Sequence, residues 1–294
     1  MIIRKETRSL GTIEFRIIDK SIAREIIVRN HYSKKWNSAF GVLNIGIFRE
    51  SRLYGVIVYG NLMNTKSYRS ISPDLKSYKD IFELNRMWIS DELGRNIESM
   101  SIAASFRFIK KLYPNVKLVQ SFADGRLGCG TIYKASNFRY YGYTKSVFFR
   151  HIKTGEVFHK APLQNSRRPY GFLKKNRYLL DRELLPFCVK TYRYIYPLYK
   201  NVRISLKRKP YPKYEKGELP CKYTHSIGIL GRLYWFYYMI EDFEYMNKTL
   251  IYTMENYGEG GVEYIRDKNK FKREIEFFTD YMKNKDREYL LGGY

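Results

Sequence analysis

The sequence predicts an α/β protein of the α+β kind, in which helices flank a mixed sheet. Short apolar segments with the period-two alternation of strands are interspersed with segments in which apolar residues recur every three or four positions, as in helices. Over residues 12–158 the expected order is β, α, β, β, β, α, β, α, β, without an internal repeat. At 294 residues the chain is long enough to bury a core.

The first elements are read from apolar spacing, polar breaks and turn residues. Ile22, Ile26 and Ile27 share one helical face, and the polar residues 49–52 separate two apolar strands. The elements expected in this part are a strand over 12–18, a helix over 21–29, a hairpin of strands over 40–48 and 53–59, a polar loop over 61–79 and a strand over 82–89.

The following elements are bounded by clear stop signals. Tyr113-Pro114-Asn115 ends a helix, and Thr154-Gly155 is a turn between two strands. The elements expected are a helix over 99–113, a strand over 119–122, a short helix with Thr131 as its N-cap and Asn137 as its stop, a strand over 138–143 and a hairpin over 148–158. Two amphipathic helices, over 230–252 and 262–285, are expected near the end, separated by the glycine-rich residues 258–261.

The positive charge is unevenly distributed. Residues 1–160 hold 28 basic and 13 acidic side chains, residues 161–220 hold 15 and 4, and residues 221–294 hold 11 and 12. Basic residues interleaved with tyrosine are suited to neutralising phosphates and stacking on bases. We therefore expect a folded domain over 1–160, a basic Lys/Arg/Tyr-rich extension that binds nucleic acid over 161–220, and a helical segment over 221–294.

Several protein classes are disfavoured by composition. Three cysteines without a CxxC pair favour a reducing, intracellular setting, and four histidines without ligand spacing argue against a metal site. No signal peptide is visible, and the most apolar stretch, 233–240, is too short to span a membrane. The sequence thus predicts a cytoplasmic protein without a bound metal or a membrane partner.

One segment, residues 119–141, combines functional groups with a compact local fold. A strand ends at the Asp124-Gly125 turn, Gly128 and Gly130 leave backbone amides free to face a ligand, and the next helix carries Tyr133. A carboxylate, a glycine-rich bend and a tyrosine are thereby expected at one end of a sheet. The alternative interpretation is a solvated aspartate in a β-turn and a packed tyrosine.

Two sets of motifs in this sequence resemble known families. The segment Ile132-Tyr133-Lys134-Ala135-Ser136-Asn137-Phe138 resembles the Leu-Tyr-x-x-x-Gly-Phe pattern of GCN5-related N-acetyltransferases. Over residues 25–160 the sequence resembles the phage Mom family of DNA adenine modification proteins, through motifs that occur in the family's order. These motifs are Asn30-His31-Tyr32-Ser33, Glu83-Leu84-x-Arg86, Ser101-Ile102-Ala103, Ser121-Phe122-Ala123-Asp124 and Ile132-Tyr133.

The resemblance implies an acetyltransferase-like fold and an activity. The substrate would be adenine in duplex DNA, and the product would carry a carbamoylmethyl group on N6 that shields phage DNA from host restriction. By the same resemblance, Tyr133 would protonate a leaving group, and Asp124 would accept a proton from the exocyclic amine or form a hydrogen bond with it. Arg86 would bind a phosphate or polarise a carbonyl. Ser101, His31 and Tyr32 would complete the pocket, where a helix-opening serine and a satisfied core histidine are the alternative interpretations.

The donor is left open between two possibilities. In acetyltransferases a loop with two glycines wraps the pyrophosphate of coenzyme A, and the corresponding residues here are Arg95, Asn96 and Ser99, with one glycine and an acidic residue among their neighbours. Acetyl coenzyme A is the donor that the wider superfamily implies. Glycyl-tRNA is the alternative, because a glycyl group on N6 is an isomer of carbamoylmethyladenine.

The expected partners are double-stranded DNA and, with the second donor, tRNA. The side chains expected to bind nucleic acid are Arg167, Arg168, Lys174, Lys175, Arg203, Lys207, Arg208 and Lys209. Two other functions compete: an N-acetyltransferase acting on a small molecule or protein, and a DNA-binding protein without catalysis. An adenine methyltransferase is disfavoured, because Ser72-Pro73-Asp74-Leu75 lacks the second proline and the aromatic residue of its base-binding loop.

Overall fold

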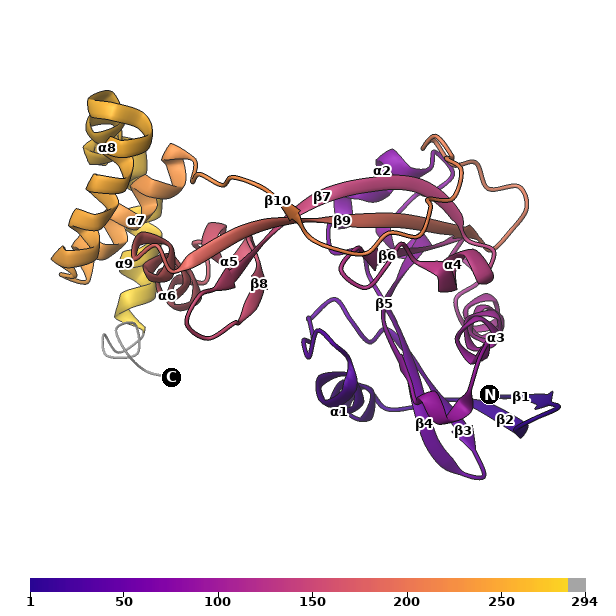
Figure 1. Cartoon of the computed structure of the whole chain (residues 1–294). Helices are drawn as coiled ribbons and strands as arrows, with labels where there is room; N and C mark the ends of the chain where they lie inside the picture. The colour runs from indigo at the N-terminus through magenta and orange to yellow at the C-terminus, as the bar shows by residue number, and fades with distance from the viewer. Residues whose placement is uncertain (285–294) are drawn as a thin grey trace. The chain divides into compact units, whose positions relative to one another are not determined.

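A computed structural model of the chain describes residues 1–284 (Figure 1). The described residues form two compact units, each with a buried core of its own. The first unit consists of Met1–Thr144 and Lys190–Gly217, and the second of Lys145–Val189 and the residues from Glu218 onward. The expected extension 161–220 is thus divided between the units, because its residues 190–197 belong to a strand of the first unit's sheet.

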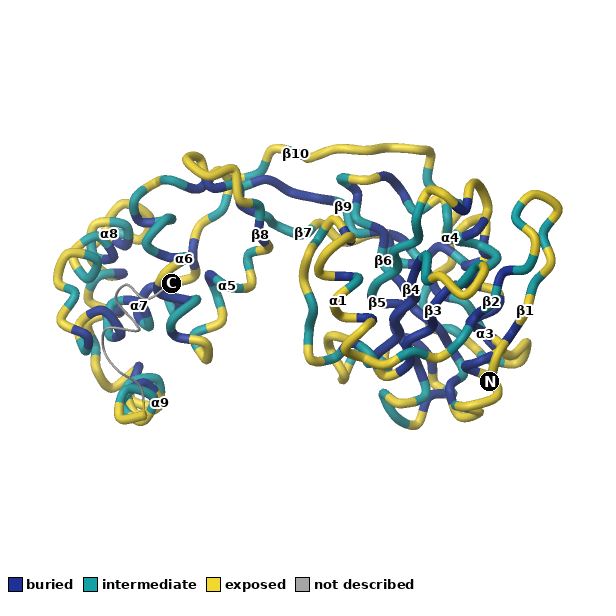
Figure 2. Tube along the Cα trace, turned by 90° about the horizontal axis from the view of Figure 1, so that it is seen from below, coloured by how far each residue is buried: buried dark blue, intermediate teal, exposed yellow. Residues whose placement is uncertain are grey.

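The first unit is built on a mixed sheet. Its strands, in spatial order, are β1 (Ile2–Thr7), β2 (Gly11–Ile17), β3 (Leu43–Arg49), β4 (Arg52–Gly60), β5 (Ile81–Ile89), β6 (Leu118–Asp124), β9 (Leu184–Pro197) and β7 (Arg139–His151). Residues 184–189 of β9 and 145–151 of β7 belong to the second unit. The register shows antiparallel pairing from β1 to β5 and between β6 and β9, and parallel pairing between β5 and β6. Figure 2 shows that the buried residues are concentrated on the central strands of this sheet.

The parallel ladder between β5 and β6 is short. It runs from Ile81–Leu118 to Glu83–Gln120, although β5 continues to Ile89 and β6 continues to Asp124. By contrast, β6 pairs with β9 along its whole length, as far as Asp124 opposite Thr191. The C-terminal halves of β5 and β6 are therefore not hydrogen-bonded to each other.

Helices pack on both faces of this sheet because the side chains of a strand alternate between faces. On one face, Ala23 and Ile27 of α1 (Lys20–Asn30) pack in a cluster with Val56 and Val58 of β4. On the other face, α3 (Ile97–Leu112) packs in a cluster with the alternate residues of β4, and the hydroxyls of Tyr59 and Ser105 lie 2.5 Å apart. The prediction of a mixed sheet flanked by helices is confirmed.

The structure corrects several expected elements of the first unit. Strand β1 was not predicted, and the predicted loop over 61–79 contains the short helix α2 (Tyr68–Ile71). Thr131 is the first helical residue of α4 (Thr131–Ala135) rather than its cap, which is Gly130 in the left-handed conformation with φ 89°. Residues 201–217 contain no helix or strand.

The second unit consists of a hairpin and a set of helices. Phe148 to Arg150 of β7 pair antiparallel with β8 (Val157–His159), which confirms the predicted hairpin. The other elements of this unit are α5 (Ala161–Gln164), α6 (Pro169–Leu180), the two-residue β10 (Leu219–Pro220), α7 (Ile227–Met239), α8 (Phe243–Arg266) and α9 (Lys272–Lys283).

The two helices expected after residue 230 are wrong in their boundaries. The first expected helix, over 230–252, is interrupted between α7 and α8. There Glu241 has φ 59°, and Asp242 caps α8 by accepting a hydrogen bond from the Tyr245 backbone amide. The expected glycine-rich separator lies inside α8, where only Gly258 leaves the helical conformation, with φ 67°. Residues 285–294 of the expected segment 221–294 lie outside the described residues, and they include Lys285, the last residue of the second expected helix.

Among the described glycines of the second unit, Gly231 of α7 is the one with the closest neighbour. A Cβ at this position would lie 1.9 Å from the ring of Phe271, which is 4% exposed and cannot swing into solvent. We predict that Gly231→Ala lowers the free energy of unfolding by roughly 1–3 kcal/mol. Gly228→Ala is the matched control, because nothing lies within 4 Å of its Cβ and alanine favours the helix. Thermal unfolding of both variants tests this, and an equal effect would contradict it.

Candidate active site

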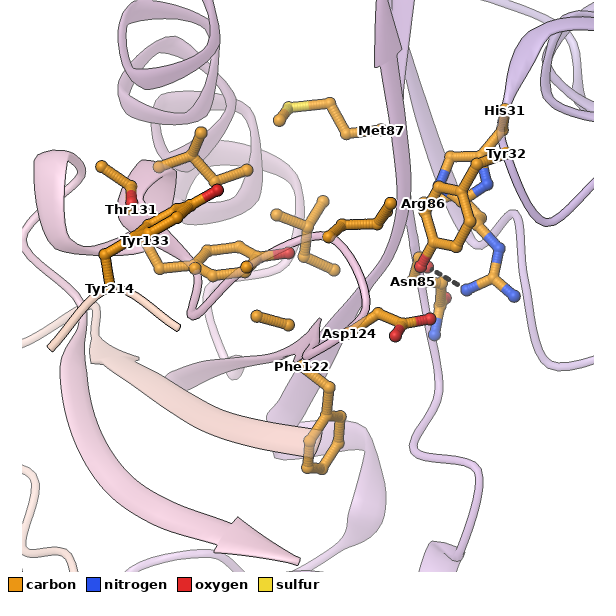
Figure 3. Close-up of a pocket in the computed structure, with 16 residues that line it drawn as sticks. His31, Tyr32, Asn85, Arg86, Met87, Phe122, Asp124, Thr131, Tyr133 and Tyr214 are labelled. Carbon is orange, nitrogen blue, oxygen red and sulfur yellow. Dashed lines mark hydrogen bonds between the residues drawn. The ribbon is translucent and has the colours of Figure 1, made fainter. Parts of the chain in front are cut away.

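A cavity of about 300 Å³ lies in the first unit where β5 and β6 are no longer paired (Figure 3). Its walls come from the end of α1, from β5 and β6, from the loop before α4, from α4 itself and from the segment after β9. The lining residues are His31, Tyr32, Leu84, Asn85, Arg86, Met87, Phe122, Ala123, Asp124, Leu127, Gly128, Gly130, Thr131, Ile132, Tyr133 and Tyr214. Five of the six predicted catalytic residues are among them.

His31 and Tyr32 follow the last turn of α1. His31 is 8% exposed, and its Nδ1 accepts a hydrogen bond of 3.1 Å from the Ser33 backbone amide, so the neutral ring carries its proton on Nε2. Burial, aided by the nearby Arg86 guanidinium, lowers the pKa of His31 to about 4. His31 is therefore uncharged at neutral pH. Tyr32 is 52% exposed and lies beside it, with ring centroids 4.2 Å apart.

Arg86 is held on β5 by a backbone acceptor and an aromatic ring. Its Nη1 donates to the Asn85 carbonyl oxygen over 2.6 Å, and its guanidinium lies 4.7 Å from the centroid of Phe40. Its Nε is buried and has no hydrogen-bond partner within residues 1–284. Burial lowers the pKa of Arg86, and the neighbouring Tyr32 and Glu83 act in the opposite direction. Arg86 thus lines the cavity while its Nε is a buried donor without a partner among the described residues.

Asp124 ends β6 and is paired with a residue that the sequence analysis missed. Arg126 contacts both oxygens of the carboxylate, with Nη2 to Oδ2 at 2.5 Å and Nε to Oδ1 at 3.0 Å, and its backbone amide donates to Oδ1 at 3.0 Å. The Asp124 side chain is 14% exposed and that of Arg126 24%. The turn residues Asp-Gly-Arg were the only sequence signal for this pair.

Tyr133 of α4 is positioned by Ser121 of the neighbouring strand. Ser121 Oγ lies 2.8 Å from the Tyr133 hydroxyl and 3.0 Å from the Leu84 carbonyl oxygen, and its single proton serves one of these two contacts. Burial raises the pKa of Tyr133, so its hydroxyl is protonated at neutral pH and can act as an acid. Ser121 belonged to a motif in the sequence analysis, but it was not predicted as a site residue.

The glycines of the loop before α4 were expected to leave backbone amides free for a ligand. In the structure they also permit close packing. Gly130 has φ 89°, and a Cβ there would lie 2.7 Å from the ring of Tyr194 and 2.9 Å from Ala123. The Tyr194 hydroxyl in turn donates to the Cys129 carbonyl oxygen. These contacts fix the start of α4 and thereby the place of Tyr133.

Ser101 does not line the cavity. It is completely buried on α3, and its Oγ has no hydrogen-bond partner among the described residues. Its neighbours Ile102 and Ser105 are also fully buried, because this face of α3 packs on the sheet. The alternative interpretation, a plain helix serine, agrees better with this position.

The residues predicted to hold a cofactor lie just before α3 and in its first turn. Asn96 and Ser99 line a separate hollow of about 420 Å³ between α3 and α4, whereas Arg95 is exposed and is not part of its lining. Glu98 stands in the first turn of α3, where its carboxylate would repel a pyrophosphate, and Gly94 is the single glycine before the helix. These residues fit coenzyme A poorly.

Two of the basic residues predicted to bind nucleic acid are paired within the protein. Arg203 contacts Asp74 with Nη2 to Oδ1 at 2.5 Å, and Lys175 contacts Glu156 at 2.6 Å. The exposed residues of the predicted set in the second unit are Arg167, Arg168 and Lys174, and those in the first unit are Arg203, Lys207, Arg208 and Lys209. The residues predicted to bind nucleic acid are therefore divided between the two units.

Two further findings concern the described residues as a whole. Within residues 1–284, no group of three or more His, Cys, Asp or Glu side chains is arranged to hold a metal ion. In the same part of the chain, every helix is too short or too polar to cross a bilayer.

The low pKa of His31 predicts how stability changes with pH. The unfolded chain binds a proton near pH 6.5 and the folded protein only near pH 4, so stability is lost as the pH falls through this range. We predict that His31→Asn reduces the fall in melting temperature between pH 7 and pH 5. His159→Asn is the control, because His159 is exposed. Equal slopes for wild type and His31→Asn would contradict the prediction.

The comparisons with known proteins point to one family. The profile of the Mom protein family matches residues 12–213. Methylcarbamoylase mom of Escherichia phage Mu is 36% identical over 219 residues, which are 69% of this chain and 86% of that protein. Among solved structures, ribosomal-protein-S5-alanine acetyltransferase from Vibrio fischeri aligns with a TM-score of 0.38 and 10% identity, and the alignment covers 67% of this chain and 98% of that protein. An N-acetyltransferase from Staphylococcus aureus Mu50 aligns with a TM-score of 0.37 and 10% identity, and the alignment covers 64% of this chain and 99% of that protein.

At these TM-scores the structural alignments carry no argument of their own. The profile match spans more than half of the chain, and the identity to the phage Mu protein extends over more than two thirds of it. The motifs in which the resemblance was seen supply nine of the cavity's lining residues, among them five predicted catalytic residues. This chain belongs to the Mom protein family.

Proposed function

We propose that this protein is an enzyme that modifies N6 of adenine in DNA, giving a carbamoylmethyl-type product that protects phage DNA from restriction. The observation that supports this most is the convergence of Asp124, Tyr133, Arg86, His31 and Tyr32 on one cavity in a member of the Mom family. The name of the phage Mu relative, methylcarbamoylase, agrees with such a product. The positive charge of residues 1–220 is suited to a nucleic-acid substrate.

The groups in the cavity match the needs of acyl transfer to an amine. The amine must lose a proton, the leaving group must gain one, and the oxygen that becomes negative must be stabilised. Asp124 is the proton acceptor in this proposal, and it takes up the proton as Arg126 shifts away from one of its oxygens. Tyr133 is the acid, because burial keeps it protonated. Arg86 stabilises the oxygen with the positive charge that it brings to the cavity.

The product cannot arise by acyl transfer alone. Carbamoylmethyladenine has a CH2 group bonded to the nitrogen on C6, whereas acyl transfer places a carbonyl carbon there. We propose that a glycyl group is first transferred to N6, with the donor's ester oxygen leaving as a hydroxyl. The glycyl amine then attacks C6 through a five-membered ring, and the C6–N6 bond breaks. The original N6 becomes the primary amide, so no atom is gained or lost in this second step.

Glycyl-tRNA is the donor that suits this route. Its activated glycyl ester supplies the acyl group, and Glu98 in the first turn of α3 argues against acetyl coenzyme A. Two nucleic acids would then bind the protein, which is consistent with its large positive charge.

The direct test is mass spectrometry of nucleosides from DNA co-expressed with the protein. A modified deoxyadenosine supports the proposal. Unmodified DNA with a folded protein would instead favour an acetyltransferase with another substrate or a DNA-binding protein without catalysis.

The roles of the acid and the base predict the effect of two substitutions. Asp124→Ala and Tyr133→Phe should each lower the modification rate by about 10²–10⁴-fold, because each removes a proton-transfer group. Binding to DNA should stay near the wild-type level, as measured by fluorescence anisotropy. Tyr238→Phe is the control, since Tyr238 is 50% exposed on α7. Full modification by either site variant would remove that residue from the mechanism.

An isotope label tests the rearrangement. Adenine labelled with heavy nitrogen at N6 should give a product with the label in the carboxamide, because N6 is expelled from C6 in the second step. Fragmentation of the modified nucleoside in the mass spectrometer locates the label. A label still attached to C6 would exclude this route and would favour direct alkylation.

The basic run at 207–209 predicts the salt dependence of DNA binding. Replacing Lys207, Arg208 and Lys209 with glutamine should weaken binding to all sequences and should flatten the plot of log K against log salt by about 0.9 for each lost phosphate contact. Replacing Lys268, Lys270 and Lys272 is the matched control, because it removes the same charge from the part of the chain without a basic surplus. An equal change of slope in the two variants would contradict a specific role for 207–209.

A further inference from the structure

Tyr214 lines the cavity and is nevertheless 71% exposed. It lies on the segment after β9 that contains no regular secondary structure, one residue beyond the match to the Mom profile. A large aromatic side chain that is both exposed and part of a cavity wall leaves much of its ring face available to a ligand.

The backbone around Tyr214 is fixed on both sides. Before it, the Lys209 amide donates to the Tyr140 carbonyl oxygen over 2.9 Å, and the Tyr211 hydroxyl donates to the Phe138 carbonyl oxygen over 2.5 Å. These two contacts anchor the segment to the start of β7.

The contacts after Tyr214 anchor the segment to the strands that carry the site. Glu215 accepts hydrogen bonds from Lys190 Nζ at 2.7 Å, and the Gly217 amide donates to the Gly125 carbonyl oxygen over 2.9 Å. The entropy of ordering this segment is therefore lost on folding and not on ligand binding, which favours binding by Tyr214.

The loop before α4 is shaped around the Tyr214 ring. Gly128 has φ 133°, which favours glycine, and a Cβ there would lie 3.2 Å from the ring edge, so a larger residue would make a tight contact with the ring. In Figure 3, Tyr214 lies on the side of the cavity formed by Thr131 and Tyr133, and Tyr32 lies on the opposite side. Both tyrosines are more than half exposed.

We propose that Tyr214 stacks on one face of the adenine base after the base has left the duplex, while Tyr32 covers the other face. This inference rests on the proposed function. Enzymes that act on a base inside a duplex extrude it and hold it between aromatic or apolar side chains. Stacking on an aromatic ring also contributes to binding without requiring a particular sequence around the base.

The test uses the full-length protein and a duplex with 2-aminopurine opposite an abasic site. Binding by the wild type should extrude the fluorescent base and quench it through stacking. Tyr214→Ala should leave the bound base brighter and weaken binding to this duplex by roughly 5- to 100-fold. Tyr214→Phe keeps the ring and should match the wild type in both measurements. Tyr199→Ala is the matched control, because Tyr199 is an exposed tyrosine close to the end of β9 that does not line the cavity.

The outcomes separate this inference from the proposed function. Quenching is measured without turnover, so it tests stacking whether or not the wild type modifies DNA. The inference is overturned if Tyr214→Ala leaves fluorescence and affinity unchanged, or if Tyr199→Ala alters them equally. It is also overturned if the wild type itself does not quench the base. Absence of modified deoxyadenosine in wild-type cells, with quenching intact, would contradict the proposed function alone.

Discussion

Strands β5 and β6 are hydrogen-bonded over only three residue pairs, and the cavity depends on this short ladder. Strand β6 stays ordered beyond it because β9 pairs with its other edge as far as Asp124. Arg86 and Asp124 therefore extend from two strands that share a sheet but are no longer bonded to each other. A ladder continued to the ends of both strands would close the space in which the base and the acyl group are proposed to meet.

The charged groups around this space are close to balance. The Asp124 carboxylate lies among the guanidiniums of Arg86 and Arg126, and His31 adds no charge because burial keeps it neutral. Burial also raises the pKa of Glu83, a second carboxyl group close to Arg86. Two guanidiniums and two carboxyl groups thus lie in this region of the first unit.

Much of the architecture was predictable because strands, helices and turns have local signatures. The ordered motifs predicted the Mom family, which the comparisons confirmed, and the hairpins followed from their turn residues. The pairing of Arg126 with Asp124 was not predictable, since an ion pair two residues apart has no periodic signal. Ser101 was misplaced because a motif match does not reveal which face of a helix packs on the sheet. The last helices were misjudged because a single residue in the left-handed conformation, Glu241, can separate two helices.

The position of β9 in the sheet has a consequence for synthesis on the ribosome. This strand lies between β6 and β7, yet it is made after both of them. Until residue 197 has emerged, the apolar edge of β6 has no partner on that side, and such an edge can pair with another chain. Rapid completion of β9 would shorten the time for which this edge is exposed. A fragment that ends at residue 160 would retain this exposed edge permanently, and we expect it to aggregate instead of folding as a separate catalytic domain.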